Sequence, residues 1–130
     1  LGLVSLQTIM MLDWRKAFDA LLSARPDWLA VSSIFYDGPV EFSTLIKEYD
    51  ADHKEMRSYH FNICPLPLLE KKMSRAGYRM EAQSFEIDID LPRPEHRSTG
   101  TYTVRSEKGR LQFTGAMHLP WWFVWAVPND

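Results

Sequence analysis

The first third of the chain alternates between apolar runs and a helical stripe. Leu3–Leu6 is a short apolar run, and residues 28–36 form a second run that is rich in β-branched and aromatic side chains. Between the two runs, apolar residues recur at the spacing of one helix face: Trp14, Ala17, Phe18, Leu21 and Leu22. We therefore expect a strand, a helix and a strand, an order typical of a parallel sheet covered by helices. Sheets of this kind hold ligands at the carboxyl ends of their strands.

Two segments in the middle of the chain also have helical spacing. Apolar residues at 42, 45, 46 and 49 predict a short helix over 42–49, and the charged stretch 50–58 is expected to be solvated. A clearer stripe over 66–76 predicts a helix that opens at Pro65 and Pro67 and ends before Gly77. Proline is tolerated in a first turn because its missing N–H would have no partner there, and glycine suits the residue after a helix.

The last third of the chain changes to a period of two, which predicts strands. Apolar residues alternate with polar ones over 78–82, and then in the opposite phase over 85–91, which predicts a bend near 83–84. Alternation returns over 101–105 and 111–119, with a hairpin turn expected at Lys108-Gly109. Residues 121–127 are apolar at every position, so we expect a strand that is covered on both faces.

Composition narrows the class of protein. The 130 residues are 45% hydrophobic and 25% charged, which fits one ordinary globular domain over 1–130. A net charge of -2 supplies no basic field for nucleic acid. Cys64 is the only cysteine, so no disulfide forms within the chain and a reducing cytoplasmic location is expected. The chain start has no basic signal-peptide region, and the apolar stretch 119–128 is far shorter than the ~20 residues of a membrane-spanning helix.

Several of these segments together resemble the distal half of a class I S-adenosylmethionine-dependent methyltransferase. They are residues 3–8, 13–17, 29–36, 66–69 with the helix that follows to Tyr78, and the closing hairpin. The resemblance implies an α/β fold: the distal half of a Rossmann-like sheet, mixed parallel and antiparallel, with a C-terminal β-hairpin. It also implies S-adenosylmethionine as cofactor and methyl transfer to a small molecule. The chain would then be the C-terminal part of a methyltransferase-like domain.

The chain departs from that family at the cofactor loop. No two of its six glycines are close enough to form a G-x-G motif, and no acidic residue can be assigned to a ribose hydroxyl. Two explanations remain: a fragment of a longer methyltransferase, or a degenerate relative with another use. The alternative functions are a non-catalytic binding or assembly module, and a β-rich carrier of a small ligand that uses the aromatic run 121–125.

Candidate site residues follow from the resemblance. Gln7 and Thr8 would end a strand beside the cofactor, and Phe35 and Tyr36 would end the next strand beside the substrate. Residues 59–62 lie where such enzymes cover the crevice, so Tyr59 and Asn62 are further substrate candidates. His60 is a candidate general base because imidazole accepts protons near neutral pH. The competing interpretations are a core role for Phe35, a turn for Gln7 and Thr8, and an exposed loop for His60.

Two further features concern metals and partners. Glu86, Asp88 and Asp90 share one face of the predicted strand, where successive carboxylates lie ~7 Å apart, so we expect a solvated face and no metal site. The segment 50–53 lacks the spacing of a calcium loop. No proline or charge protects Leu3–Leu6, so if this strand forms a sheet edge, we expect a homodimer joined near it. No nucleic-acid or membrane partner is expected.

Overall fold

The structure of this chain is a computed structural model that describes residues 9–95 and 100–130. The predicted strand at Leu3–Leu6 lies outside the described residues, and so do Gln7 and Thr8. The homodimer expected at that strand therefore stays a prediction.

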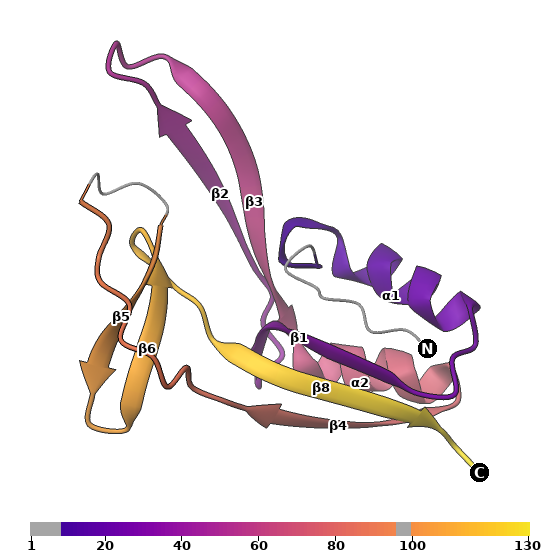
Figure 1. Cartoon of the computed structure of the whole chain (residues 1–130). Coiled ribbons are helices and arrows are strands. Elements are labelled where there is room, and N and C mark those ends of the chain that lie inside the picture. The colour runs from indigo at the N-terminus through magenta and orange to yellow at the C-terminus, as the bar shows by residue number, and fades with distance from the viewer. Residues whose placement is uncertain (1–8, 96–99) are drawn as a thin grey trace.

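Two sheets and two α-helices make up the fold, which is mixed α/β (Figure 1). The main sheet has the order β2-β3-β1-β8-β4, and the smaller sheet has the order β5-β6-β7. The elements are η1 (Ile9–Met11), α1 (Trp14–Ser23), β1 (Leu29–Tyr36), β2 (Phe42–Tyr49), β3 (Glu55–Pro65), α2 (Leu66–Arg75), β4 (Tyr78–Ser84), β5 (Thr101–Ser106), β6 (Gly109–Thr114), β7 (Met117–His118) and β8 (Trp121–Pro128).

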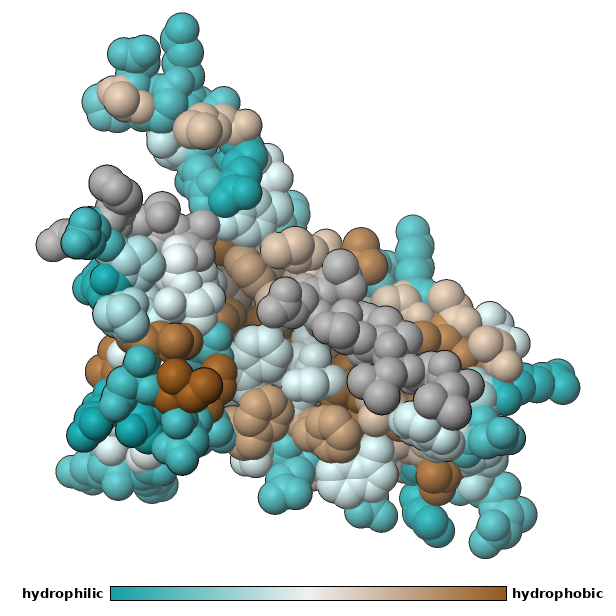
Figure 2. Space-filling model, viewed as in Figure 1, coloured by the Kyte–Doolittle hydropathy of each residue, from teal (hydrophilic) through white to brown (hydrophobic). Residues whose placement is uncertain are grey.

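The main sheet combines parallel and antiparallel pairing, as the sequence predicted. β8 lies between β1 and β4 and is antiparallel to both, so β1 and β4 run in the same direction. On the other side, β1 pairs in parallel with β3 only at its last two residues, Phe35 and Tyr36. Beyond this contact, β2 and β3 leave the sheet as a long arm (Figure 1), and its far end is covered mostly by hydrophilic side chains (Figure 2).

Both helices pack on one face of the main sheet. Phe18 of α1 and Leu69 and Met73 of α2 are fully buried, and they join one core cluster with Val31 of β1 and Val124 of β8. The predicted stripes of both helices are thus confirmed, because the residues at their centres are the ones that lose contact with water. Burial of this kind is the main source of stability for helices of this length.

Local signals fix the helix ends, and the ends predicted for the helix over 66–76 are confirmed. The Asp13 carboxylate caps α1 by accepting a hydrogen bond from the Arg15 N–H. α2 begins directly after Pro65, with a second proline in its first turn. Gly77 follows α2 with φ of 84°, a left-handed conformation that glycine adopts without steric cost.

The prediction of a helix over 42–49 was wrong, because this segment is strand β2. It pairs with β3 along its whole length, from Phe42 opposite Ile63 to Tyr49 opposite Glu55. The turn between the strands is fixed by the Asp50 carboxylate, which accepts hydrogen bonds from two backbone N–H groups of the turn. Pairing with β3 outweighs the helical spacing, and the aromatic and β-branched residues of the segment suit a strand.

Three predictions about the last third also need correction. The alternating segment 85–91 forms no strand ladder, although β4 does end at Ser84 beside the predicted bend. The alternation over 111–119 is divided between β6 and β7 by a turn at Gly115, where φ is 56°. β8 is not covered fully on both faces: Val124 and Ala126 face the helices, while on the other face Trp121 packs against a second, smaller core cluster and Phe123 is 42% exposed. A period of two indicates an extended backbone, but it does not show whether one face or both faces of the strand are covered.

Two neighbouring leucines of α2 allow a test of this packing. Leu69 is fully buried in the core, whereas Leu68 is 38% exposed. Leu69→Ala is expected to lower the free energy of unfolding by about 2–5 kcal/mol, because it leaves a cavity. Leu68→Ala is the matched control and should change it by about 0.5 kcal/mol or less. Chemical denaturation measures both values, and equal losses in the two variants would contradict the orientation of α2.

Candidate functional site

An aromatic pocket of about 430 Å³ lies at the carboxyl end of β1. Phe35 and Tyr36, the last two residues of β1, line it together with Phe42 at the start of β2 and Trp122 of β8. Ile63 and Pro120 complete its apolar walls. The surface is therefore suited to a flat or apolar ligand, since such pockets are lined mainly by hydrophobic and aromatic side chains.

Backbone pairing places these aromatic residues. The β1–β8 ladder sets Ser33 opposite Trp122, and the Phe35 N–H donates to the Pro120 carbonyl at 3.1 Å where the ladder ends. Tyr36 and Phe42 meet edge to face, with ring centroids 5.3 Å apart across the turn between β1 and β2. Phe35 is fully buried, while Tyr36 and Phe42 are 39% and 42% exposed, so the pocket has a fixed base and an accessible rim.

Two polar side chains line the same pocket. Asp37 directly follows β1, and His118 ends β7. Both are exposed, and the His118 ring lies 5.4 Å from the Phe113 ring, measured between centroids. A ligand held against the aromatic wall would therefore meet one carboxylate and one imidazole. These groups bind cations and accept protons.

The other substrate candidates from the sequence lie on the arm. Tyr59 and Asn62 are residues of β3, where the Tyr59 hydroxyl donates to Glu48 at 3.2 Å and the Asn62 amide donates to the Leu12 carbonyl at 3.0 Å. His60 is exposed opposite Leu45 of β2. None of the three lines the aromatic pocket, so of the predicted residues that the structure describes, only Phe35 and Tyr36 lie together there.

Sequence reasoning missed the other lining residues of the pocket, among them Phe42, His118 and Trp122. Phe42 was assigned to a helix, and Trp122 was assigned to the core. The strand at 111–119 gave no reason to place His118 near β1. The available signal was Tyr36 and Phe42 on either side of the turn at Gly38-Pro39, because a tight turn brings its flanking residues together.

The carboxylates of the 85–91 segment are paired, not merely solvated as the sequence suggested. Arg110 of β6 donates to Asp88 at 2.6 Å and to Asp90 at 2.7 Å, and Arg105 of β5 donates to Asp90 at 2.8 Å. Glu86 accepts from the Arg110 backbone N–H at 3.1 Å. The segment is thus attached to the small sheet mainly through side chains, with one backbone hydrogen bond from Thr103 to Leu91, and it alternates without forming a strand ladder.

These arginines also determine the protonation of Asp90. Hydrogen bonds from Arg110 and Arg105 hold the pKa of the Asp90 carboxyl well below its usual range. Among the described residues, no group of three or more His, Cys, Asp or Glu side chains could hold a metal ion. Burial raises the pKa of the Cys64 thiol well above its ordinary value, so this group is not suited to act as a nucleophile.

Asp90 allows a test by pH and by mutation. Because the pKa of Asp90 is lower in the folded state, its carboxylate stabilises attachment of the segment at pH values above the unfolded pKa of about 3.9. This contribution is lost as the pH falls from that value through the folded-state pKa. Asp90→Asn should therefore speed hydrogen exchange of the Leu91 and Thr103 amides, which take part in hydrogen bonds between the segment and β5. Asp88→Asn is the control, because it removes one ion pair with Arg110 and leaves the pairs of Asp90 in place. It should raise the exchange rates less than Asp90→Asn does. Equal exchange rates in the two variants would show that Asp90 does not anchor the segment.

Comparison with known proteins found no relative of this chain. No protein-family model, no curated protein and no solved structure matches the chain. Within residues 9–95 and 100–130, the structure contains no helix with the length and apolar character needed to cross a membrane.

Proposed function

We propose that this chain is a methyltransferase-like domain whose aromatic pocket receives a small acceptor molecule. The observation that carries the proposal is the pocket at the end of β1. Phe35 and Tyr36, which the family resemblance assigns to substrate contact, line it together with Phe42 and Trp122. A cytoplasmic location belongs to the proposal and fits Cys64, which is a free thiol.

The arrangement of the main sheet supports the proposal. The resemblance implies a Rossmann-like sheet that is closed by an antiparallel hairpin at the C-terminal end. The hairpin expected at Lys108-Gly109 lies instead in the separate sheet β5-β6-β7, and β8 is the antiparallel strand of this part of the main sheet. In this chain β1 and β4 run in the same direction, and β8 is antiparallel between them. α1 and α2 cover one face of this unit. In open α/β sheets, ligands bind beyond the carboxyl ends of strands, which is where the pocket lies.

The chain's own residues would act mainly by positioning. Holding the acceptor against Phe35 and Trp122 fixes its plane, and a fixed approach to a methyl donor is the larger part of catalysis by proximity. His118 at the same pocket is placed to accept a proton from the acceptor group, a role that the sequence suggested for His60. His60 itself lies outside the pocket, on the arm.

Among residues 9–95 and 100–130, no complete set of groups for S-adenosylmethionine is found. The sequence has no Gly-rich loop, and Gln7 and Thr8 lie outside the described residues. The one carboxylate of the pocket, Asp37, is exposed, and the remaining lining is largely apolar. When bound, the cofactor would supply the methyl group. The proposal for the chain concerns the acceptor side alone.

The missing Gly-rich loop favours a second candidate, a binding module that holds the same small ligand without transferring a methyl group. The aromatic run 121–125 suggested a β-rich carrier, but its side chains point to both faces of β8. Only Trp122 of that run lines the pocket. A ligand carrier would therefore rely on the end of β1 and not on an aromatic platform along β8.

Indole can serve as a probe of the pocket. Its binding should shift the amide NMR signals of residues around Phe35 and Trp122. Phe42→Ala should weaken this binding about tenfold, because it removes one aromatic wall. Phe123→Ala is the matched control: Phe123 is also 42% exposed but does not line the pocket, so its loss should leave indole binding unchanged. Shifts elsewhere in the chain, or equal effects of the two variants, would contradict the site.

The cofactor can be tested separately by calorimetry. The 130-residue chain should bind S-adenosylmethionine weakly or not at all, because no Gly-rich loop brings backbone N–H groups to the cofactor. A dissociation constant in the micromolar range would contradict this expectation and would favour an enzyme over a binding module. Indole binding without cofactor binding fits the acceptor-side proposal and the binding module alike.

A further inference from the structure

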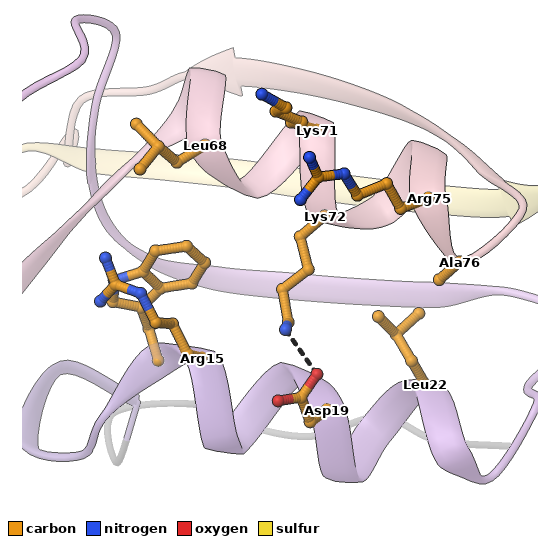
Figure 3. Close-up of a pocket in the computed structure, with 9 residues that line it drawn as sticks. Arg15, Asp19, Leu22, Leu68, Lys71, Lys72, Arg75 and Ala76 are labelled. Carbon is orange, nitrogen blue, oxygen red and sulfur yellow. Dashed lines mark ion pairs between the residues drawn. The ribbon is translucent and has the colours of Figure 1, made fainter.

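A groove of about 570 Å³ lies between α1 and α2, apart from the aromatic pocket. Figure 3 shows the two helices side by side, with Lys72 and Asp19 reaching towards each other across the middle of the groove. Leu68 and Arg15 lie at one end, and Leu22 and Ala76 lie at the other. The groove thus follows about two turns of each helix.

The charge of this groove is opposite to that of the chain. Four cations line it against one carboxylate, in a chain whose net charge is -2. Two of the cations are already paired: Lys72 with Asp19, and Arg15 with Glu41 at 2.8 Å. Within the described part of the chain, Lys71 and Arg75 have no ion-pair partner, so they remain available to an acidic ligand.

The groove also contains an apolar floor and an unused donor. Trp14, Leu22 and Leu68 line it, and Leu68 is 38% exposed. Trp14 is 3% exposed, and its indole Nε1 is buried with no hydrogen-bond partner. A buried donor without an acceptor costs free energy, so Trp14 is held here by its packing.

We propose that this groove is a docking surface for an acidic amphipathic helix of a partner protein. The apolar side chains of such a helix would lie on Leu22 and Leu68, and its carboxylates would pair with Lys71 and Arg75. Amphipathic helices bind in grooves between helices through apolar anchors together with charged contacts. The lining residues extend from Trp14 to Leu22 on α1 and from Leu68 of α2 to Ala76 directly after it, so the groove suits an elongated segment that lies over the Lys72–Asp19 pair.

The length of the groove along α1 sets the length of the partner helix. Trp14 and Leu22 are eight residues apart on α1, which corresponds to about 12 Å along the axis. A helix of about three to four turns would cover the groove, with apolar residues at i, i+3, i+4 and i+7 and acidic residues on both sides of that stripe.

The test uses a fluorescein-labelled peptide of about 14 residues, built from Leu, Ala and Glu in that pattern. Its binding to the full chain is measured by fluorescence anisotropy. Lys71→Glu combined with Arg75→Glu should weaken binding at least about tenfold, because two attractive pairs become repulsive. Lys54→Glu with Lys108→Glu is the matched control, since it makes the same charge change at exposed residues outside the groove and should leave affinity within about twofold.

A second variant tests the apolar floor without altering charge. Leu68→Ala should weaken the peptide several-fold, because it removes exposed apolar surface from the groove. A peptide with Lys in place of Glu should not bind. Circular dichroism of each variant confirms that α2 is retained.

Four outcomes would overturn the proposal. They are no saturable binding of the acidic peptide, equal losses in the two charge-reversal variants, association of the chain with itself through the groove, and binding to vesicles of anionic lipid in place of the peptide. The last outcome would assign the cations to a membrane surface instead of a protein partner.

Discussion

The position of β8 between β1 and β4 is the constraint on which the rest of this fold depends. Its backbone pairs with β1 from Trp121 to Ala126 and with β4 from Trp122 to Pro128, so both of its edges are used. The same strand contributes Val124 to the core beneath the helices. Without β8, two strands would lose their shared neighbour and both helices would lose part of the surface that buries their apolar stripes.

The pocket is a consequence of where the ladders around β1 end. β1 has β8 on one side for most of its length, and β3 on the other side only at Phe35 and Tyr36. After these residues the chain continues into β2 and β3, which form the arm. Trp122 of β8 lies near the end of β1 and forms one wall of the pocket. The apolar walls therefore belong to strands held by backbone hydrogen bonds, while Asp37 and His118 lie at exposed positions of the site.

The small sheet is attached to the remainder by a different kind of interaction. Arg105 and Arg110 hold the 85–91 segment by ion pairs at exposed positions, and such pairs are individually weak and sensitive to salt and acid. His118 lies between Met117 and Leu119, which pack with Ile34 and Phe61 in a second apolar cluster, so its position does not depend on the ion pairs alone. The groove between α1 and α2 depends on the larger core cluster, in which Phe18 and Leu69 hold the two helices against the sheet.

The sequence by itself determined the elements with strong local signals. Asp13 before α1, the prolines at the start of α2 and Gly77 after it act through hydrogen bonds and backbone angles within a few residues, so they can be read from the chain alone. Phe35 and Tyr36 were placed correctly at the end of a strand for the same reason. Only the tertiary structure decided that 42–49 is a strand and that 85–91 is not, because each outcome depends on partners outside the segment: β3 for the first and two arginines of the small sheet for the second. The same holds for Phe42, Trp122 and His118, since a pocket formed by several strands depends on their register and not on any local pattern.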